Sequence, residues 1–153
     1  IGASVKRVFY RKAHTLRSDL TSLSELYNKM TITMIAIISP IATLWFIYAE
    51  IIFPLVFGEG WMQAAVFSKW LLIMFGANFV GAPTRALFIV FNIQKYLLII
   101  DTCEAIIKLV VIIFMAQYFS AITVVITYSL LSALTSFCFI FGWFLYFLRQ
   151  RAL

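Results

Sequence analysis

The chain has 153 residues, of which 64% are hydrophobic and only 12% charged, and its mean hydropathy is +1.03. Soluble domains average about 45–50% apolar and 25% charged residues, so this composition excludes disorder, a secreted disulfide scaffold and nearly every soluble enzyme fold. The net charge of +6 is concentrated in a basic N-terminal segment that adjoins an apolar run, which favours the cytoplasmic face of a membrane over a nucleic-acid partner.

The first predicted element is an amphipathic helix within the basic segment, residues 1–29. Leu16, Leu20, Leu23 and Tyr27 recur at spacings of four, three and four, with polar residues between them. This spacing places the apolar side chains on one face of a helix. We therefore expect a cytoplasmic interfacial helix that lies along the membrane surface before the chain enters the bilayer.

Residues 30–153 are predicted to form a polytopic, all-α bundle of four transmembrane helices. Twenty helical residues span about 30 Å, the thickness of the hydrocarbon core. Residues 30–49 carry no charge, and Pro40 is expected to kink the helix there. The uncharged run 109–148 is too long for one crossing, and its polar interruption at 117–120 predicts a hairpin. The predicted helices cover about 30–50, 64–91, 96–119 and 121–148.

The charges outside these helices predict the orientation. The outer ends hold Glu50, Glu59 and a single cation, Lys69. Cytoplasmic loops of membrane proteins are enriched in Lys and Arg, so the opposite ends are predicted to be inside, with both termini cytoplasmic. The cations at those ends are Lys6, Arg7, Arg11, Lys12, Arg17, Lys29, Lys95, Arg149 and Arg151.

Four ionisable residues fall inside the predicted helices. Asp101, Glu104 and Lys108 follow one another at spacings of three and four and so share a helix face. Arg85 lies at the depth of Asp101, because a short loop makes their helices antiparallel neighbours, and we expect it to pair with Asp101 or Glu104. A charge inside the membrane costs several kcal/mol or more, so such residues usually face a cavity. The alternative is structural: Arg85 snorkels to the interface while Glu104 and Lys108 neutralise each other.

The sequence shows no motif for enzymatic or metal chemistry. It has no phosphate-binding glycine loop, no HExxH and no plausible catalytic triad. His14 is the only histidine, and Cys103 and Cys138 lack CxxC spacing. We therefore expect no catalytic residue, no metal site and no cofactor.

Two stretches resemble a known family: AEIIFPLVFGEGWMQAA at 49–65 and, more weakly, APTRALFIVFNIQKY at 82–96. With the order of helices around them, they resemble the C-terminal part of bacterial polysaccharide-transporter flippases. These are the O-antigen (Wzx-type) branch of the multidrug/oligosaccharidyl-lipid/polysaccharide exporter superfamily. The chain would then be the last third of a MATE-like flippase fold, and its start at Ile1 without a methionine also leads us to expect a piece of a longer protein.

The resemblance implies a non-enzymatic transporter in the bacterial inner membrane that flips undecaprenyl-diphosphate-linked oligosaccharide units for O-antigen, lipopolysaccharide or capsule biosynthesis. Its expected partners are this lipid-linked substrate, membrane lipids and the remaining N-terminal helices of the same transporter. Arg85 and Lys108 would meet diphosphate or acidic sugars in a central cationic cavity, with Asp101 and Glu104 beside them. A multidrug/cation antiporter of the same superfamily is the near alternative. A polysaccharide polymerase or glycosyltransferase is disfavoured, because the predicted outer connections are too short for a catalytic loop.

Overall fold

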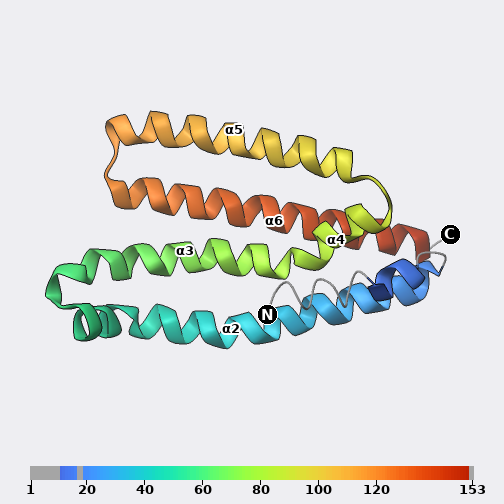
Figure 1. The fold of residues 1–153 in the computed structure, drawn as a ribbon, viewed down its shortest axis with the longest axis horizontal. Coiled ribbons are helices and arrows are strands. Elements are labelled where there is room, and N and C mark those ends of the chain that lie inside the picture. The colour runs from blue at the N-terminus through green and yellow to red at the C-terminus, as the bar shows by residue number, and fades with distance from the viewer. Residues whose placement is uncertain (1–10, 17–18, 152–153) are drawn as a thin grey trace.

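The protein is an elongated bundle of helices in the computed structural model, which describes residues 11–16 and 19–151. A short helix at 11–15 precedes four long helices that lie side by side in the order α2, α3, α6, α5 (Figure 1). All described elements are helical, which confirms the all-α prediction. The elements are α2 (Leu20–Phe57), η1 (Glu59–Trp61), α3 (Met62–Val80), α4 (Ala82–Val90), α5 (Gln94–Tyr118) and α6 (Ala121–Arg151).

The helix α2 is continuous over 38 residues and contains Pro40 and Pro54. Its N-terminus is capped by Asp19, whose carboxylate accepts hydrogen bonds from the backbone amides of Thr21 and Ser22 at 3.1 and 3.2 Å. The sequence predicted a surface helix up to residue 29 and a separate crossing helix after it. The structure instead continues α2 across that boundary, because no glycine or proline interrupts the chain before Pro40.

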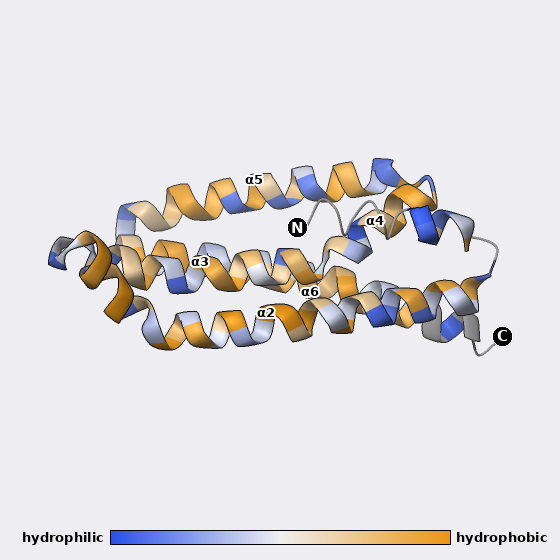
Figure 2. Ribbon diagram, turned by 60° about the horizontal axis from the view of Figure 1, so that its bottom comes forward, coloured by the Kyte–Doolittle hydropathy of each residue, from blue (hydrophilic) through white to orange (hydrophobic). Residues whose placement is uncertain are grey.

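Within residues 11–16 and 19–151, three helical stretches are long and apolar enough to cross a membrane: Leu20–Phe57, Glu59–Val90 and Ala121–Tyr146. The remaining long helix, α5, has 25 residues and carries three charges in its middle part, so its crossing stays a prediction. Hydrophobic residues cover the helices along their length (Figure 2). Many of their large side chains, such as Leu55 and Leu98, are exposed in the described chain, as expected of a surface that faces lipid or further helices.

Small residues bring α3 and α6 into close contact. Ala77 and Gly81 lie on one side of this contact, Ser132 and Ser136 on the other, and all four are buried. A Cβ atom added at Gly81 would lie 3.9 Å from Cβ of Ser136. The spacings Ala77-x-x-x-Gly81 and Ser132-x-x-x-Ser136 therefore mark a helix interface, since small residues let two backbones approach closely.

A tight turn reverses the chain between α4 and α5. Asn92 adopts a left-handed conformation, with φ of 58°, and the amide of Ile93 donates to the carbonyl of Phe88 at 2.8 Å. This six-to-one hydrogen bond is typical of a Schellman helix end, where the residue in the left-handed conformation is usually Gly and sometimes Asn. The turn places the first half of α5 beside α4, and this arrangement brings the predicted charged residues together.

The cluster of buried hydrophobic side chains lies at the end of the bundle where α2 begins and α6 ends, an end that Figure 1 shows beside α4. Tyr27 is central to them, because its hydroxyl lies 3.0 Å from Oγ1 of Thr84 and donates to the carbonyl of Ile140 at 3.2 Å. These contacts connect α2 to α4 and α6. The buried cluster comprises Ala13, Leu23, Tyr27, Ala86, Leu87 and Val90.

Candidate functional site: a charged cavity between α3, α4, α5 and α6

The first pair of charges in the cavity joins α4 to α5. Nη1 of Arg85 donates to Oδ1 and Oδ2 of Asp101 at 3.0 and 3.1 Å. The two side chains are 31% and 38% exposed, so the pair lies partly inside the bundle. This contact confirms the pairing predicted from their matched depth and contradicts the alternative in which Arg85 snorkels away from any acid.

The second pair lies one turn deeper along α5. Nζ of Lys108 donates to Oε1 of Glu104, and the two side chains are only 14% and 10% exposed. The same Glu104 oxygen accepts a hydrogen bond from Oγ1 of Thr135 on α6 at 2.9 Å. The Lys108 ammonium also lies 5.4 Å from the centre of the Tyr128 ring, within cation–π distance. Glu104 and Lys108 thus neutralise each other while both contact α6.

A cavity of about 400 Å³ joins the two pairs. All four charged residues that the sequence singled out line it, so the structure brings the predicted site residues to one place. Three helices besides α5 contribute polar side chains to its wall. The lining residues are Asn78, Arg85, Asp101, Glu104, Ala105, Lys108, Leu109, Ile112 and Tyr128.

The charges of the cavity wall cancel. Arg85 and Lys108 supply two cations, and Asp101 and Glu104 supply two carboxylates. This differs from the cationic cavity that the family resemblance implies. An unpaired charge would be costly at this depth, and each cation is therefore held by an acid of the same wall. The cations can bind an external anion by exchanging a carboxylate for it.

Sequence reasoning missed the uncharged polar residues of the site. Tyr128 and Thr135 on α6 are seven residues apart, and so are Asn78 and Arg85 on α3 and α4. Seven residues make two helical turns, so each spacing repeats on one face. The seven-residue interval was the available signal that the two members of each pair share a helix face.

The end of the bundle at the connection between α2 and α3 has an ion pair of its own. Nζ of Lys69 on α3 lies 2.8 Å from Oε1 of Glu50 on α2, and Lys69 also lies over the ring of Phe46. Among the described residues, no group of three or more His, Cys, Asp or Glu is placed to hold a metal ion. The two cysteines, Cys103 and Cys138, are free thiols exposed on α5 and α6.

Comparison with known proteins adds one match. Residues 1–66 match the family model described as polysaccharide biosynthesis protein. The match takes in α2, η1 and the stretch 49–65 that carries the main resemblance, but it spans less than half of the chain and ends before Arg85. Neither the curated proteins nor the solved structures give a significant match. The match and the apolar helices together support a membrane protein of polysaccharide biosynthesis.

Proposed function

We propose that the chain is part of a flippase that moves undecaprenyl-diphosphate-linked oligosaccharide units across the bacterial inner membrane for O-antigen, lipopolysaccharide or capsule biosynthesis. The observation that carries the proposal is the neutral four-charge cavity within helices of membrane length. It lies in a chain whose first 66 residues match polysaccharide biosynthesis proteins. The protein acts without catalysing a covalent step, and α5 forms the fourth crossing helix.

The paired charges suit transient binding of an anion. A bare cation in this position would be costly, whereas Arg85 and Lys108 are each held by a carboxylate until another anion arrives. A diphosphate offers acceptor oxygens to a guanidinium and an ammonium. Arg85 and Lys108 bind the head group as their acids are displaced, and the acids take the cations back on release. The head group therefore leaves as readily as it enters.

The test is complementation of surface polysaccharide in a flippase-deficient cell, with protein level measured alongside. Lys108→Ala in the full-length transporter should reduce transport, and Lys108→Arg should retain part of it, because the charge is kept and its geometry changes. Lys69→Ala is the matched control, since Lys69 is equally enclosed and acid-paired but lies outside the cavity.

A double variant separates substrate binding from a structural role of the pair. Glu104→Gln with Lys108→Met removes both charges, so no charge of this pair is left without a partner. The proposal predicts normal protein level and little polysaccharide from this double variant. If Lys108→Ala gives full surface polysaccharide at a normal protein level, Lys108 does not bind the substrate and serves only as the structural partner of Glu104.

A cation antiporter is the second candidate, because the same cavity holds two carboxylates. Carboxylates are the groups that such a transporter would use to bind a proton or a cation. Asp101→Asn and Glu104→Gln would then abolish transport while Arg85→Gln and Lys108→Gln leave it intact. The flippase predicts the reverse order of severity. Removing one partner of the Glu104–Lys108 pair also destabilises the protein, so transport is compared per molecule of protein in the membrane, and this ratio distinguishes the two functions.

The proposed orientation places the start of α2, the α4–α5 turn and the end of α6 in the cytoplasm. These parts hold Lys29, Lys95 and Arg149, whereas the other end holds Glu59 and the Glu50–Lys69 pair.

The orientation is tested in a variant whose Cys103 and Cys138 are replaced by serine. A new cysteine at Glu59 should react with an impermeant maleimide added outside intact cells, and one at Lys95 should not. Labelling at position 95 but not at 59 would invert the assignment.

A further inference from the structure

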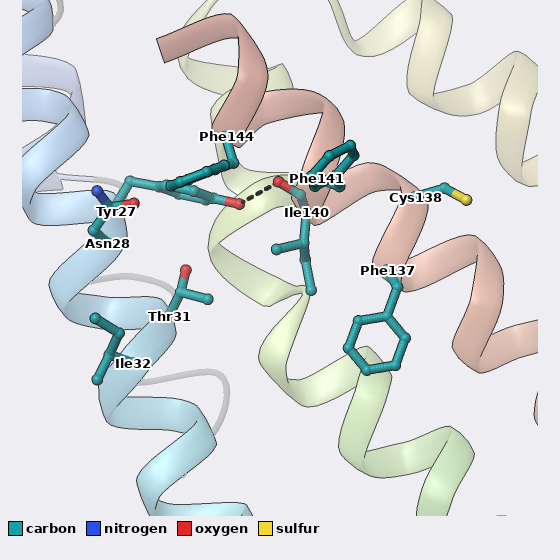
Figure 3. A pocket seen from close by; sticks show the side chains of 9 residues that line it. All are labelled: Tyr27, Asn28, Thr31, Ile32, Phe137, Cys138, Ile140, Phe141 and Phe144. Atoms are coloured by element: carbon teal, nitrogen blue, oxygen red, sulfur yellow. Dashed lines mark hydrogen bonds between the residues drawn. The ribbon is translucent and has the colours of Figure 1, made fainter. Parts of the chain in front are cut away.

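A second cavity lies between α2 and α6, on the far side of α6 from α5. It is a groove of about 630 Å³ that opens sideways between the two helices (Figure 3). Its wall is almost entirely apolar and aromatic. The lining residues are Tyr27, Asn28, Thr31, Ile32, Phe137, Cys138, Ile140, Phe141 and Phe144. None of these residues contributes to the charged cavity.

The groove contains one buried hydroxyl without a hydrogen-bond partner. Oγ1 of Thr31 is unpaired although the residue is only 7% exposed, and its side chain projects from the side of α2 that faces α6 (Figure 3). Thr33, two residues on, has instead satisfied its hydroxyl by donating to the carbonyl of Lys29 at 2.7 Å. An unpaired buried hydroxyl is unfavourable, so the groove presents a donor that a ligand oxygen would satisfy.

The polarity of the groove changes along its length. The exposed Lys29 follows the lining residue Asn28, and the exposed Arg149 lies five residues beyond Phe144, which corresponds to about 7.5 Å along α6. Thr31 lies one turn deeper than Asn28. Below it, the wall is hydrocarbon. Along α2 and α6 the order of features is therefore two exposed cations toward the end of the groove, then a hydroxyl donor, then an apolar channel.

This order matches one class of molecule in the bilayer. A glycerophospholipid carries an anionic head group, ester carbonyls just below it and acyl chains beneath. We propose that the groove binds a single anionic glycerophospholipid. Its phosphate lies near Lys29 and Arg149, an ester carbonyl accepts the Thr31 hydroxyl, and one acyl chain lies along Ile32 and Phe137.

Another helix is a poorer occupant of the same groove. Helices in this protein pack closely where both surfaces carry small residues, as α3 and α6 do. The groove wall presents the bulky rings of Phe137, Phe141 and Phe144 instead, which keep a second helix backbone at a distance. A flexible acyl chain fills such an irregular apolar space.

The experiment measures lipid retained by the purified full-length chain, using native mass spectrometry after exchange into phosphatidylglycerol or phosphatidylcholine. The wild type should keep one phosphatidylglycerol in preference to phosphatidylcholine. Thr31→Val should lower retention of both lipids by roughly three- to tenfold, the effect of one hydrogen bond. Thr31→Ser should restore retention, and Thr33→Val should behave like the wild type. The double variant Lys29→Gln with Arg149→Gln should lose the preference for the anionic lipid.

Three results would overturn the proposal. Equal lipid retention by Thr31→Val and Thr33→Val would show that the hydroxyl contacts no lipid. A lipid-free dimer would assign the groove to a second copy of the chain. Retention of added polyprenyl phosphate in place of phosphatidylglycerol would assign the groove to the transported substrate class. Circular dichroism of each variant verifies that the helices are intact.

Discussion

The two faces of α6 differ in how they hold their neighbours. Toward α3, buried Ser132 and Ser136 pack against small residues, and the backbones come close. Toward α5, the contact depends on the hydrogen bond from Thr135 to Glu104 and leaves a cavity of about 400 Å³ beside it. None of the residues of α5 is fully buried.

This difference indicates that the α3–α6 contact is structural, whereas the α5–α6 contact belongs to the candidate site. Close packing of small residues gives a rigid contact, because any added volume forces the backbones apart. A contact made by paired charges beside a cavity can be exchanged for contacts with a ligand. We therefore expect α3 and α6 to move as a unit, and α5 to be the helix that shifts relative to them.

The largest effect on stability should come from breaking the deeper ion pair. Glu104→Gln leaves the enclosed Lys108 without its carboxylate and should lower the free energy of unfolding by about 3–5 kcal/mol. Glu104→Gln with Lys108→Met should recover most of that loss, because no unpaired charge remains. Thermal unfolding in detergent measures both. If the double variant is as unstable as Glu104→Gln alone, the pair stabilises the protein by contacts other than the neutralisation of Lys108.

A smaller effect is expected from overfilling the other face of α6. Ser132→Leu adds volume where α3 leaves none and should destabilise the protein by about 1–3 kcal/mol. The control is Gly142→Leu on the same helix, because a Cβ atom there meets nothing within 4 Å. The same unfolding measurement compares the two. Equal stability of the two variants would mean that the α3–α6 contact is looser than its small residues indicate.

The smallest effect should lie outside both interfaces, at the start of α2. Hydrogen bonds from Ser22, and then from Thr21, hold the pKa of the Asp19 carboxyl below its usual 3.8. Because the pKa of Asp19 is lower in the folded chain than in the unfolded chain, its charge stabilises the cap at every pH above the unfolded-state pKa. That stabilisation is lost as the pH falls through the folded-state pKa. Hydrogen-exchange protection of the Thr21 and Ser22 amides should therefore fall in this acid range. Asp19→Asn should show no such pH dependence.

The sequence predicted much of the fold because the relevant signals are local. Runs of uncharged residues located the long helices, and the polar residues at 117–120 located the hairpin between α5 and α6. The continuity of α2 was missed, because amphipathic spacing and a later apolar run look like two elements when they are read separately. Whether a helix continues across such a change depends on the absence of a stop signal, and none lies between Leu20 and Pro40.

The site was predicted only as far as one helix could show it. The spacing of Asp101, Glu104 and Lys108 fixed their common face, and loop length fixed the depth of Arg85. The contribution of α6 was not predicted, because the contact of Thr135 with Glu104 depends on the rotation of α6 about its own axis. That rotation is set by the small residues of a different interface, which carry no chemistry of their own.

The spatial order of the helices also has a consequence for biogenesis. As the chain emerges from the ribosome, α3 and α4 are synthesised before α5 and α6, yet α6 lies between α3 and α5 (Figure 1). Arg85 gains its acid as soon as α5 follows, while the small-residue face of α3 stays without a partner until α6 inserts. Of the helices α2 to α6, α6 is synthesised after the other four and closes the bundle from within. A chain truncated at the α5–α6 hairpin would keep the Arg85–Asp101 ion pair but lack the contact between α3 and α6.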